Sequence, residues 1–201
     1  EPIPYLVDAD YLPAGITQTQ AVTAVQTALA AWTNVTSLRY RFAGIQSFGM
    51  APRYVTASDG VLRIQLHDHY NYITNGGGGD TLGEGGHAWT SLNRTNGWTT
   101  GGNVMGNDFH KVTRGYLVLK HTNVVMQTLS TFTEVLTHEI GHTIGLGHSS
   151  VNPDEPNPIL KQAAMYFEVH ADGRGAAVTN FDIHVSRQIH PSTNTPPYCY
   201  D

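Results

Sequence analysis

Charged residues, cysteine and long apolar runs are scarce in this sequence of 201 residues, and each shortage excludes a class of protein. Lysine and arginine total 11 and form no cluster, and the formal net charge is −5, so neither nucleic acid nor an anionic membrane is expected as a partner. No apolar run approaches the roughly 18 residues that span a bilayer, which predicts a soluble chain. The single cysteine, Cys199, excludes an intrachain disulfide and a thiolate metal cluster.

Histidine, in contrast, is abundant. The 11 histidines equal all lysines and arginines together, which indicates either a pH-dependent surface or a metal site. Apolar residues make up 40% of the chain, enough for a sizeable core, and the length of 201 residues fits one domain. The sequence begins at Glu1 and not at methionine, so we expect a mature form whose leader has been removed, and therefore a secreted protein.

Hydrophobic periodicity predicts an α+β fold in which most strands precede the central helix. Strands are expected at Ile3–Val7, Leu38–Ala43, Val61–Leu66, His87–Ser91 and Tyr116–Lys120. Helices are expected to begin near Thr17, Thr131 and Thr179. Thr17 and Gln20 have the spacing of a capping box, and Thr179 is the expected N-cap of the last helix.

Three histidines have a spacing that fits one metal ion. His138 and His142 are four residues apart and therefore share one face of the central helix. Gly145 can adopt a left-handed conformation that ends the helix, so that the chain turns back and brings His148 to the same ion. Three imidazole ligands leave zinc an open fourth position for catalysis, and Glu139 can reach a water there without binding the metal.

These residues match all five specified positions of the motif H-E-x-x-H-x-x-G-x-x-H, and in this the sequence resembles the metzincin zinc endopeptidases. Ser149 and the segment Ala163-Ala164-Met165-Tyr166 resemble one family of that clan, the matrixins, whose Met-turn passes beneath the zinc. The resemblance implies a twisted, mostly parallel sheet with three helices. It also implies an upper subdomain of about residues 1–147 and a smaller lower one of about 148–201. Met165 would then form the floor of the zinc site without binding the ion.

The function that the resemblance implies is hydrolysis of extended protein or peptide substrates by a monomeric zinc endopeptidase. Zinc would lower the pKa of its bound water, and Glu139 would accept the proton and pass it to the leaving amine. Two alternatives stay open at this point. One is a metzincin of another family, and the other is a zinc-binding module without turnover, against which the retained Glu139 argues.

Glu134 lies one helical turn before His138, and two roles for it are open. With Thr131 it has the spacing of a capping box at the start of the central helix. By its resemblance to the matrixin position, it would lie at the bottom of the pocket for P1′, the substrate residue that follows the scissile bond. A carboxylate at that place would favour a basic P1′ side chain.

A second ion is also open. His67, His69 and His87 resemble part of the matrixin structural zinc site, although one position that is aspartate in matrixins is His69 here. Asp80 and Glu84 lie among glycines and offer oxygen ligands for calcium instead. Three further histidines have no partner pattern and are expected at the surface: His170, His184 and His190.

Overall fold

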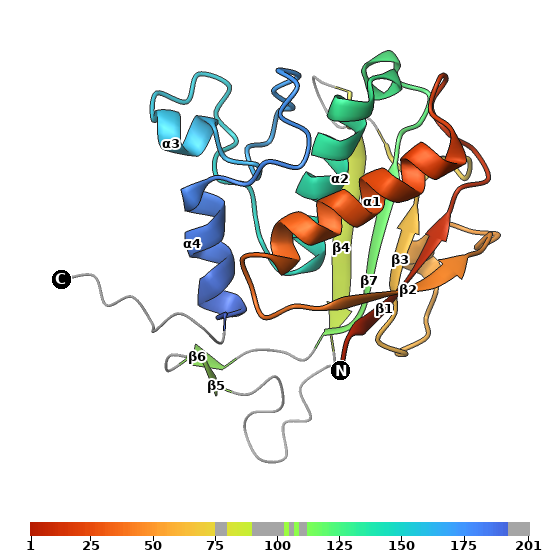
Figure 1. Cartoon of the computed structure of the whole chain (residues 1–201), viewed down its shortest axis with the longest axis horizontal. Helices are drawn as coiled ribbons and strands as arrows, with labels where there is room; N and C mark the ends of the chain where they lie inside the picture. Colours follow the sequence, from red (N-terminus) through yellow and green to blue (C-terminus); the bar gives the residue numbers. More distant parts are fainter. Residues whose placement is uncertain (75–79, 90–102, 105–106, 109–111, 193–201) are drawn as a thin grey trace.

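The computed structural model describes most of the chain, and Figure 1 gives its arrangement. The described residues are 1–74, 80–89, 103–104, 107–108 and 112–192. Cys199 therefore lies outside them, as do two residues, 90 and 91, of one predicted strand. None of the helices in the described part is both long and apolar enough to cross a lipid bilayer.

A five-stranded sheet in the order β2-β1-β3-β7-β4 forms the centre of the fold. Four strands run parallel to one another: β1 (Ile3–Asp8), β2 (Tyr40–Ile45), β3 (Leu62–Gln65) and β7 (Val112–Leu119). The fifth, β4 (Gly83–Trp89), pairs antiparallel with β7 and ends the sheet. Two short strands, β5 (Asn103–Val104) and β6 (Asn107–Asp108), form a separate pair. The predicted α+β architecture with a mostly parallel sheet is confirmed.

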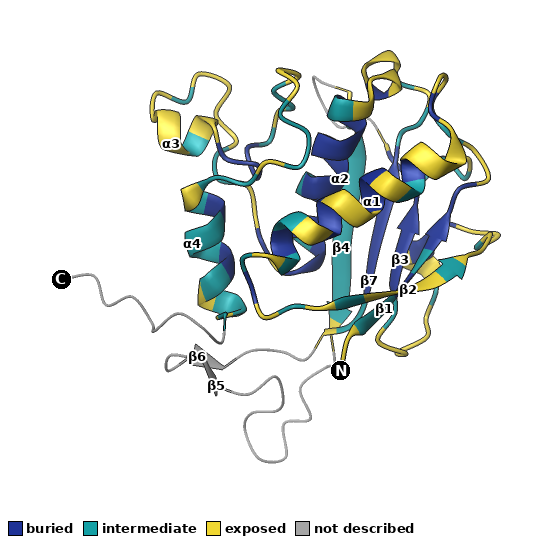
Figure 2. Ribbon diagram, viewed as in Figure 1, coloured by how far each residue is buried: buried dark blue, intermediate teal, exposed yellow. Residues whose placement is uncertain are grey.

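The strand boundaries differ most from the sequence prediction at the glycine-rich edge. β4 begins at Gly83, four residues before the expected start at His87, because its glycines pair normally with β7 although they resemble a loop in the sequence. β2 is shifted by two residues relative to the predicted Leu38–Ala43. Figure 2 shows how burial differs across the sheet: β3 and most of β7 are dark blue, whereas β4 is only half-buried along most of its length.

Two long helices cover the same face of the sheet (Figure 1). α1 (Gln18–Thr33) begins with the predicted capping box, and its apolar stripe faces the core while its outer face is exposed (Figure 2). α2 (Leu129–Thr143) carries the histidine motif and is buried on most sides. Trp32 ties the two helices together, since its indole Nε1 donates a 2.9 Å hydrogen bond to the carbonyl of Thr137. The helix of the metal motif is thus fixed by the core.

The chain after α2 forms a smaller group of elements beside the sheet (Figure 1). Of the short helices, η1 (Pro52–Tyr54) and η3 (Val124–Gln127) precede α2, and α3 (Pro158–Lys161) follows it. The last helix, α4 (Asn180–Ile189), begins after the predicted N-cap Thr179, and Val185 and Ile189 pack against the main core. The division into subdomains near residue 147 stays a prediction.

Candidate active site

The side chains of His138, His142 and His148 converge at the C-terminal end of α2. The Nε2 atom of His142 lies 3.1 Å from that of His138 and 3.2 Å from that of His148. Four ligands at about 2.05 Å from a zinc ion in a tetrahedron are about 3.3 Å apart, so this spacing fits three corners of such a site. The structure thus brings together the three ligands that the sequence predicts.

The remaining hydrogen bonds of these histidines leave their Nε2 lone pairs for a metal. Nδ1 of His138 donates to the carbonyl of Ala164, and Nδ1 of His142 donates to that of Leu146, both at 2.8 Å. Since a carbonyl oxygen only accepts, the proton of each neutral ring lies on Nδ1, and the lone pair of Nε2 is available to a metal ion. Such outer partners fix the tautomer and orientation of metal-binding histidines.

The neutral state that metal binding requires is favoured by burial. Burial, assisted by the neighbouring His142, lowers the pKa of His138 to about 3. Burial also lowers the pKa of His142, and it lowers that of His148 together with the adjacent His142. The three rings therefore remain uncharged near neutral pH, and protons compete little with a metal cation for their nitrogens.

The turn after α2 positions His148 as predicted. Gly145 has a φ of 100°, in the region where a side chain would be strained, and it ends the helix. The N–H of Leu146 then donates to the carbonyl of Gly141 at 3.0 Å, which closes the turn in the manner of a helix C-cap. His148 reaches the other two histidines only because the chain reverses here.

Glu139 lies next to this cluster and is almost completely buried, at 5% exposure. Burial raises the pKa of its carboxyl to about 8, and the backbone N–H of Gly85 opposes that rise. Its Oε2 has no hydrogen-bond donor. A Cβ on Gly83 would lie 2.7 Å from the Cγ of Glu139, so a glycine on β4 is needed for this close approach. The glutamate is thus held with one oxygen unpartnered.

Met165 lies beneath the histidine cluster and is 2% exposed. A Cβ on Gly141 would overlap the sulfur of Met165, so the helix and the methionine are packed as closely as a glycine permits. The carboxylate of Asp182 accepts hydrogen bonds from the N–H groups of Ala164 at 2.8 Å and of Met165 at 3.2 Å. The start of α4 thereby fixes the segment below the histidines.

A cavity of about 770 Å³ opens beside the histidines. Its walls come from the start of β4, from α2 and from the segment after Met165; they include His138, Glu139, Glu134, Tyr166 and Phe167. The hydroxyl of Tyr166 donates to the carbonyl of Asn152 at 2.8 Å, so this tyrosine braces the wall of the cavity. The arrangement combines a metal-binding cluster, an unpartnered carboxylate oxygen and a space large enough for a substrate side chain.

A comparison with protein families places the chain in one of them. The family model described as Matrixin matches residues 3–181 of the chain. The chain belongs to the matrixin family. Its members are metalloendopeptidases that use a catalytic zinc, so this matrixin is a hydrolase that acts on protein or peptide substrates. Among curated proteins, none shows significant sequence similarity to the chain.

The capping role for Glu134 is wrong in this matrixin. α2 begins at Leu129 with Thr128 as its N-cap, and Thr128 makes no side-chain cap hydrogen bond, so Thr131 lies inside the helix. Glu134 instead accepts two hydrogen bonds through Oε1, from the backbone N–H of His170 at 2.7 Å and from its Nδ1 at 2.8 Å. His170 was expected at the surface, but its side chain is only 10% exposed because of this pairing.

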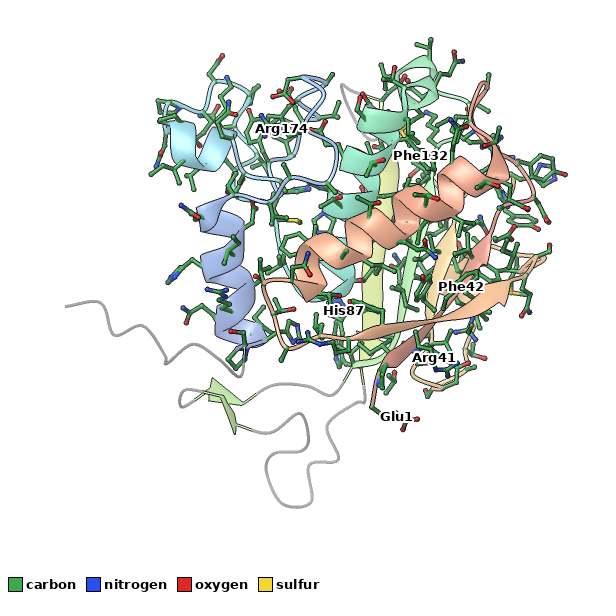
Figure 3. The ribbon with its side chains drawn as sticks, in the orientation of Figure 1. Glu1, Arg41, Phe42, His87, Phe132 and Arg174 are labelled. Carbon is green, nitrogen blue, oxygen red and sulfur yellow. The ribbon has the colours of Figure 1, made fainter. Side chains whose placement is uncertain are left out.

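The histidines considered for a second ion are divided between two places. His67 and His69 lie near Tyr11 and His121, with 6.3 Å between the ring centroids of His67 and His69. His87 lies instead on β4 (Figure 3), with Nδ1 3.2 Å from the carbonyl of His142. The His67 ring is close to two carboxylates, those of Asp8 and Asp10. A second zinc at these residues stays a prediction.

The two acidic residues considered for calcium have protein partners. Asp80 lies 3.6 Å from the ammonium of Lys120 and accepts a 3.0 Å hydrogen bond from Asn123. Glu84 lies 3.1 Å from the guanidinium of Arg53 and also accepts a hydrogen bond from the hydroxyl of Tyr72. The two clusters of potential ligands in the described residues contain neither of them. A calcium ion here also stays a prediction.

Several supporting residues of this site were missed by the reasoning from the sequence. Gly141 occupies an unspecified position of the motif, and only its packing on Met165 shows its role. Asp182 lies in the first turn of α4, and the sequence does not show that its carboxylate also accepts hydrogen bonds from the backbone at Ala164 and Met165. Arg174, labelled in Figure 3, donates to the carbonyl of Gln162 at 2.8 Å and so ties the segment before α4 to the end of α3.

Proposed function

We propose that this matrixin cleaves internal peptide bonds of extended polypeptides, with His138, His142 and His148 as the zinc ligands and Glu139 as the general base. One observation carries this proposal. Three histidine Nε2 atoms meet, and in His138 and His142 Nε2 is unprotonated because Nδ1 donates to a carbonyl; the adjacent Glu139 has a buried oxygen that receives no hydrogen bond from the described residues. Nitrogen lone pairs that face one another at N–N distances of 3.1 to 3.2 Å repel unless a proton or a metal ion lies between them. The proposal includes a secreted location and a monomeric state.

The chemistry is divided between the metal and Glu139. Zinc, when bound, polarises the scissile carbonyl and makes water acidic enough to attack near neutral pH. Glu139 accepts the proton of the attacking water and later delivers it to the leaving amine nitrogen. Its surroundings favour both transfers, since burial makes its carboxylate more basic than that of an exposed glutamate, while a cation at the histidines favours the ionised form.

We propose that the substrate binds along β4. This strand ends the sheet order, so its outer edge can pair with an extended peptide through backbone hydrogen bonds. Glycines at positions 83 and 85 bring the strand against Glu139, and a peptide beside the strand is thereby next to the general base. Selection by shape and backbone pairing also agrees with the low charge content of the chain, 13%.

Two residues support the site without touching the substrate. Gly145 allows the reversal that delivers His148, through its φ of 100°. Met165 forms the floor under the ligands, in contact with Gly141, and we propose that the segment around it is the Met-turn of this matrixin. Neither residue offers a nitrogen or carboxylate oxygen to the ion, so Gly145 acts through its backbone conformation and Met165 through packing.

A chelator assay on a denatured protein substrate tests this proposal. We expect cleavage that stops with a chelator, returns on addition of zinc, and falls by about 10²–10⁴-fold in kcat in Glu139→Ala. Cleavage that is insensitive to the chelator, or full activity of the variant, would contradict the mechanism. Zinc binding without cleavage by the unaltered chain would instead support the alternative of a module that has lost turnover.

A further inference from the structure

The cavity beside the histidines ends at a carboxylate. Glu134 lines it from α2, one turn before His138, which corresponds to about 6 Å along the helix axis. Because His138 and Glu139 line the same cavity, a substrate whose scissile bond lies at these residues must place a neighbouring side chain into it. That side chain belongs to one of the two residues that flank the scissile bond.

The two oxygens of Glu134 have different partners. Oε1 accepts both hydrogen bonds from His170, whereas Oε2 is buried and has no donor among the residues that the structure describes. The side chain as a whole is only 8% exposed. A buried carboxylate oxygen without a donor is costly, so a donor that arrives with the substrate removes a cost that the free enzyme carries.

The charge of the cavity lining favours a cationic donor. Its described residues include four acids and neither lysine nor arginine: Asp80, Glu134, Glu139 and Glu168. Asp80 already lies near Lys120, outside the lining, whereas Glu168 is exposed near Glu134 on the segment that follows Met165. Two of these acids, Glu134 and Glu139, are buried and have an oxygen without a partner among the described residues, and Glu139 is assigned to the chemistry.

We propose that Glu134 selects substrates with a lysine or arginine side chain next to the scissile bond, and that this side chain donates to its Oε2 within the cavity. The proposal rests on the proposed endopeptidase function and deepens it. His170 holds Oε1 and orients the carboxylate, since its Nε2 is itself fixed by a 2.8 Å hydrogen bond to the carbonyl of Lys161. The chain therefore recognises basic segments of extended polypeptides.

A peptide library provides the first test. Peptides are compared that carry lysine, arginine or norleucine on either side of the scissile bond, because norleucine matches the lysine chain but has no charge. We expect kcat/KM to be about tenfold higher for lysine or arginine than for norleucine at one of the two flanking positions. Equal rates for all three side chains at both positions would overturn the proposal.

Two matched variants assign any preference to its residue. Glu134→Gln keeps the shape and an acceptor for His170 but removes the charge, and we expect the ratio of kcat/KM between lysine and norleucine peptides to fall to about unity. Glu168→Gln removes an exposed carboxylate near the same cavity, and we expect the preference to remain. A preference lost in Glu168→Gln and retained in Glu134→Gln would overturn the assignment.

A binding measurement separates this proposal from the mechanism. Zinc-loaded Glu139→Ala is titrated with fluorescent lysine and norleucine peptides, and we expect about tenfold tighter binding of the lysine peptide, a difference that Glu139→Ala/Glu134→Gln loses. Absence of any chelator-sensitive cleavage by the unaltered chain would refute the endopeptidase function itself. Cleavage without basic preference, together with equal binding of the two peptides, would refute only the role of Glu134.

Discussion

Two histidine clusters in this molecule differ in whether their ring nitrogens are bound to other groups of the protein. At the end of α2 the Nε2 atoms of His138, His142 and His148 face one another without a protein partner other than themselves. Near β3 the Nε2 of His67 donates to Asp8 at 3.0 Å, and its Nδ1 accepts from the N–H of His69 at 3.3 Å. The number of histidines in a place therefore predicts less than which ring nitrogens remain unused.

Burial also acts differently in the two clusters. At the metal site, burial removes protons from rings that then have lone pairs to offer. At the second cluster, His67 and Asp8 are both fully buried and satisfy each other. Burial raises the pKa of Asp8, but hydrogen bonds from His67 and from the N–H groups of Phe48 and Asp10 outweigh it, so the net shift is downward. In the second cluster a buried ring and a buried carboxylate thus pair with each other, whereas in the first the Nε2 atoms face one another.

The largest expected difference between the clusters is in metal content. We expect His142→Ala to lose its zinc and to fall to assay background, because two histidines cannot complete the site. His67→Ala is the matched substitution in the other cluster, and we expect it to keep the catalytic zinc. Metal analysis by mass spectrometry after dialysis checks both variants. Loss of an ion from His67→Ala alone would show that the second cluster also binds metal.

The second difference is in stability. We expect His67→Ala to lower the free energy of unfolding by about 3 kcal/mol, since it leaves the carboxylate of Asp8 buried without its main partner. His142→Ala should lower the free energy of unfolding by less when both variants are metal-free, because the ring of His142 is only partly buried and the partners of its Nε2 are histidines. Urea unfolding of both variants with chelator present measures this, and equal losses would remove the distinction.

The packing under the metal site gives a third test. A methyl group at Gly141 would overlap the sulfur of Met165, so we expect Gly141→Ala to cost about 1–3 kcal/mol and to weaken zinc binding. Gly147→Ala is the control, because a Cβ there would meet nothing within 4 Å. Thermal unfolding and zinc titration compare the two variants. If Gly141→Ala behaves like Gly147→Ala, the floor is not tightly packed.

The smallest expected effect concerns the pH dependence of the Glu134 and His170 pair. The hydrogen bond to Glu134 raises the pKa of His170 although burial opposes the rise. Its contribution is therefore complete below the unfolded pKa of about 6.5 and is lost as the pH rises through the folded value. We expect His170→Gln to cost about 1 kcal/mol at pH 6 and less at pH 9. A pH-independent difference in urea unfolding would contradict this pairing.

The sequence predicts the parts of this site that depend on local spacing. His138 and His142 are four residues apart on one helix, and the glycine that allows the chain to turn back lies at the end of that helix. Such local features can be predicted from the sequence alone. The capping box of Thr17 with Gln20 and the N-cap Thr179 were predicted for the same reason, since all of their atoms lie within four residues.

The parts that the sequence did not predict depend on contacts between distant segments. The pairing of Glu134 with His170 spans 36 residues, and nothing in the local pattern distinguishes it from a helix cap. The glycines at the start of β4 resemble a loop in the sequence. Their strand conformation follows from pairing with β7 and from the closeness of Glu139, and both are contacts between distant segments. Such features follow from packing, which periodicity does not encode.

Asp182 has a consequence for the order in which the molecule is assembled. Its carboxylate accepts from Thr179 at the start of α4 and from Ala164 and Met165 below the histidines. A chain emerging from the ribosome therefore has its three histidines long before the support beneath them is complete. Asp182 follows His148 by 34 residues in the sequence, so this support is completed only after all three histidines have been made.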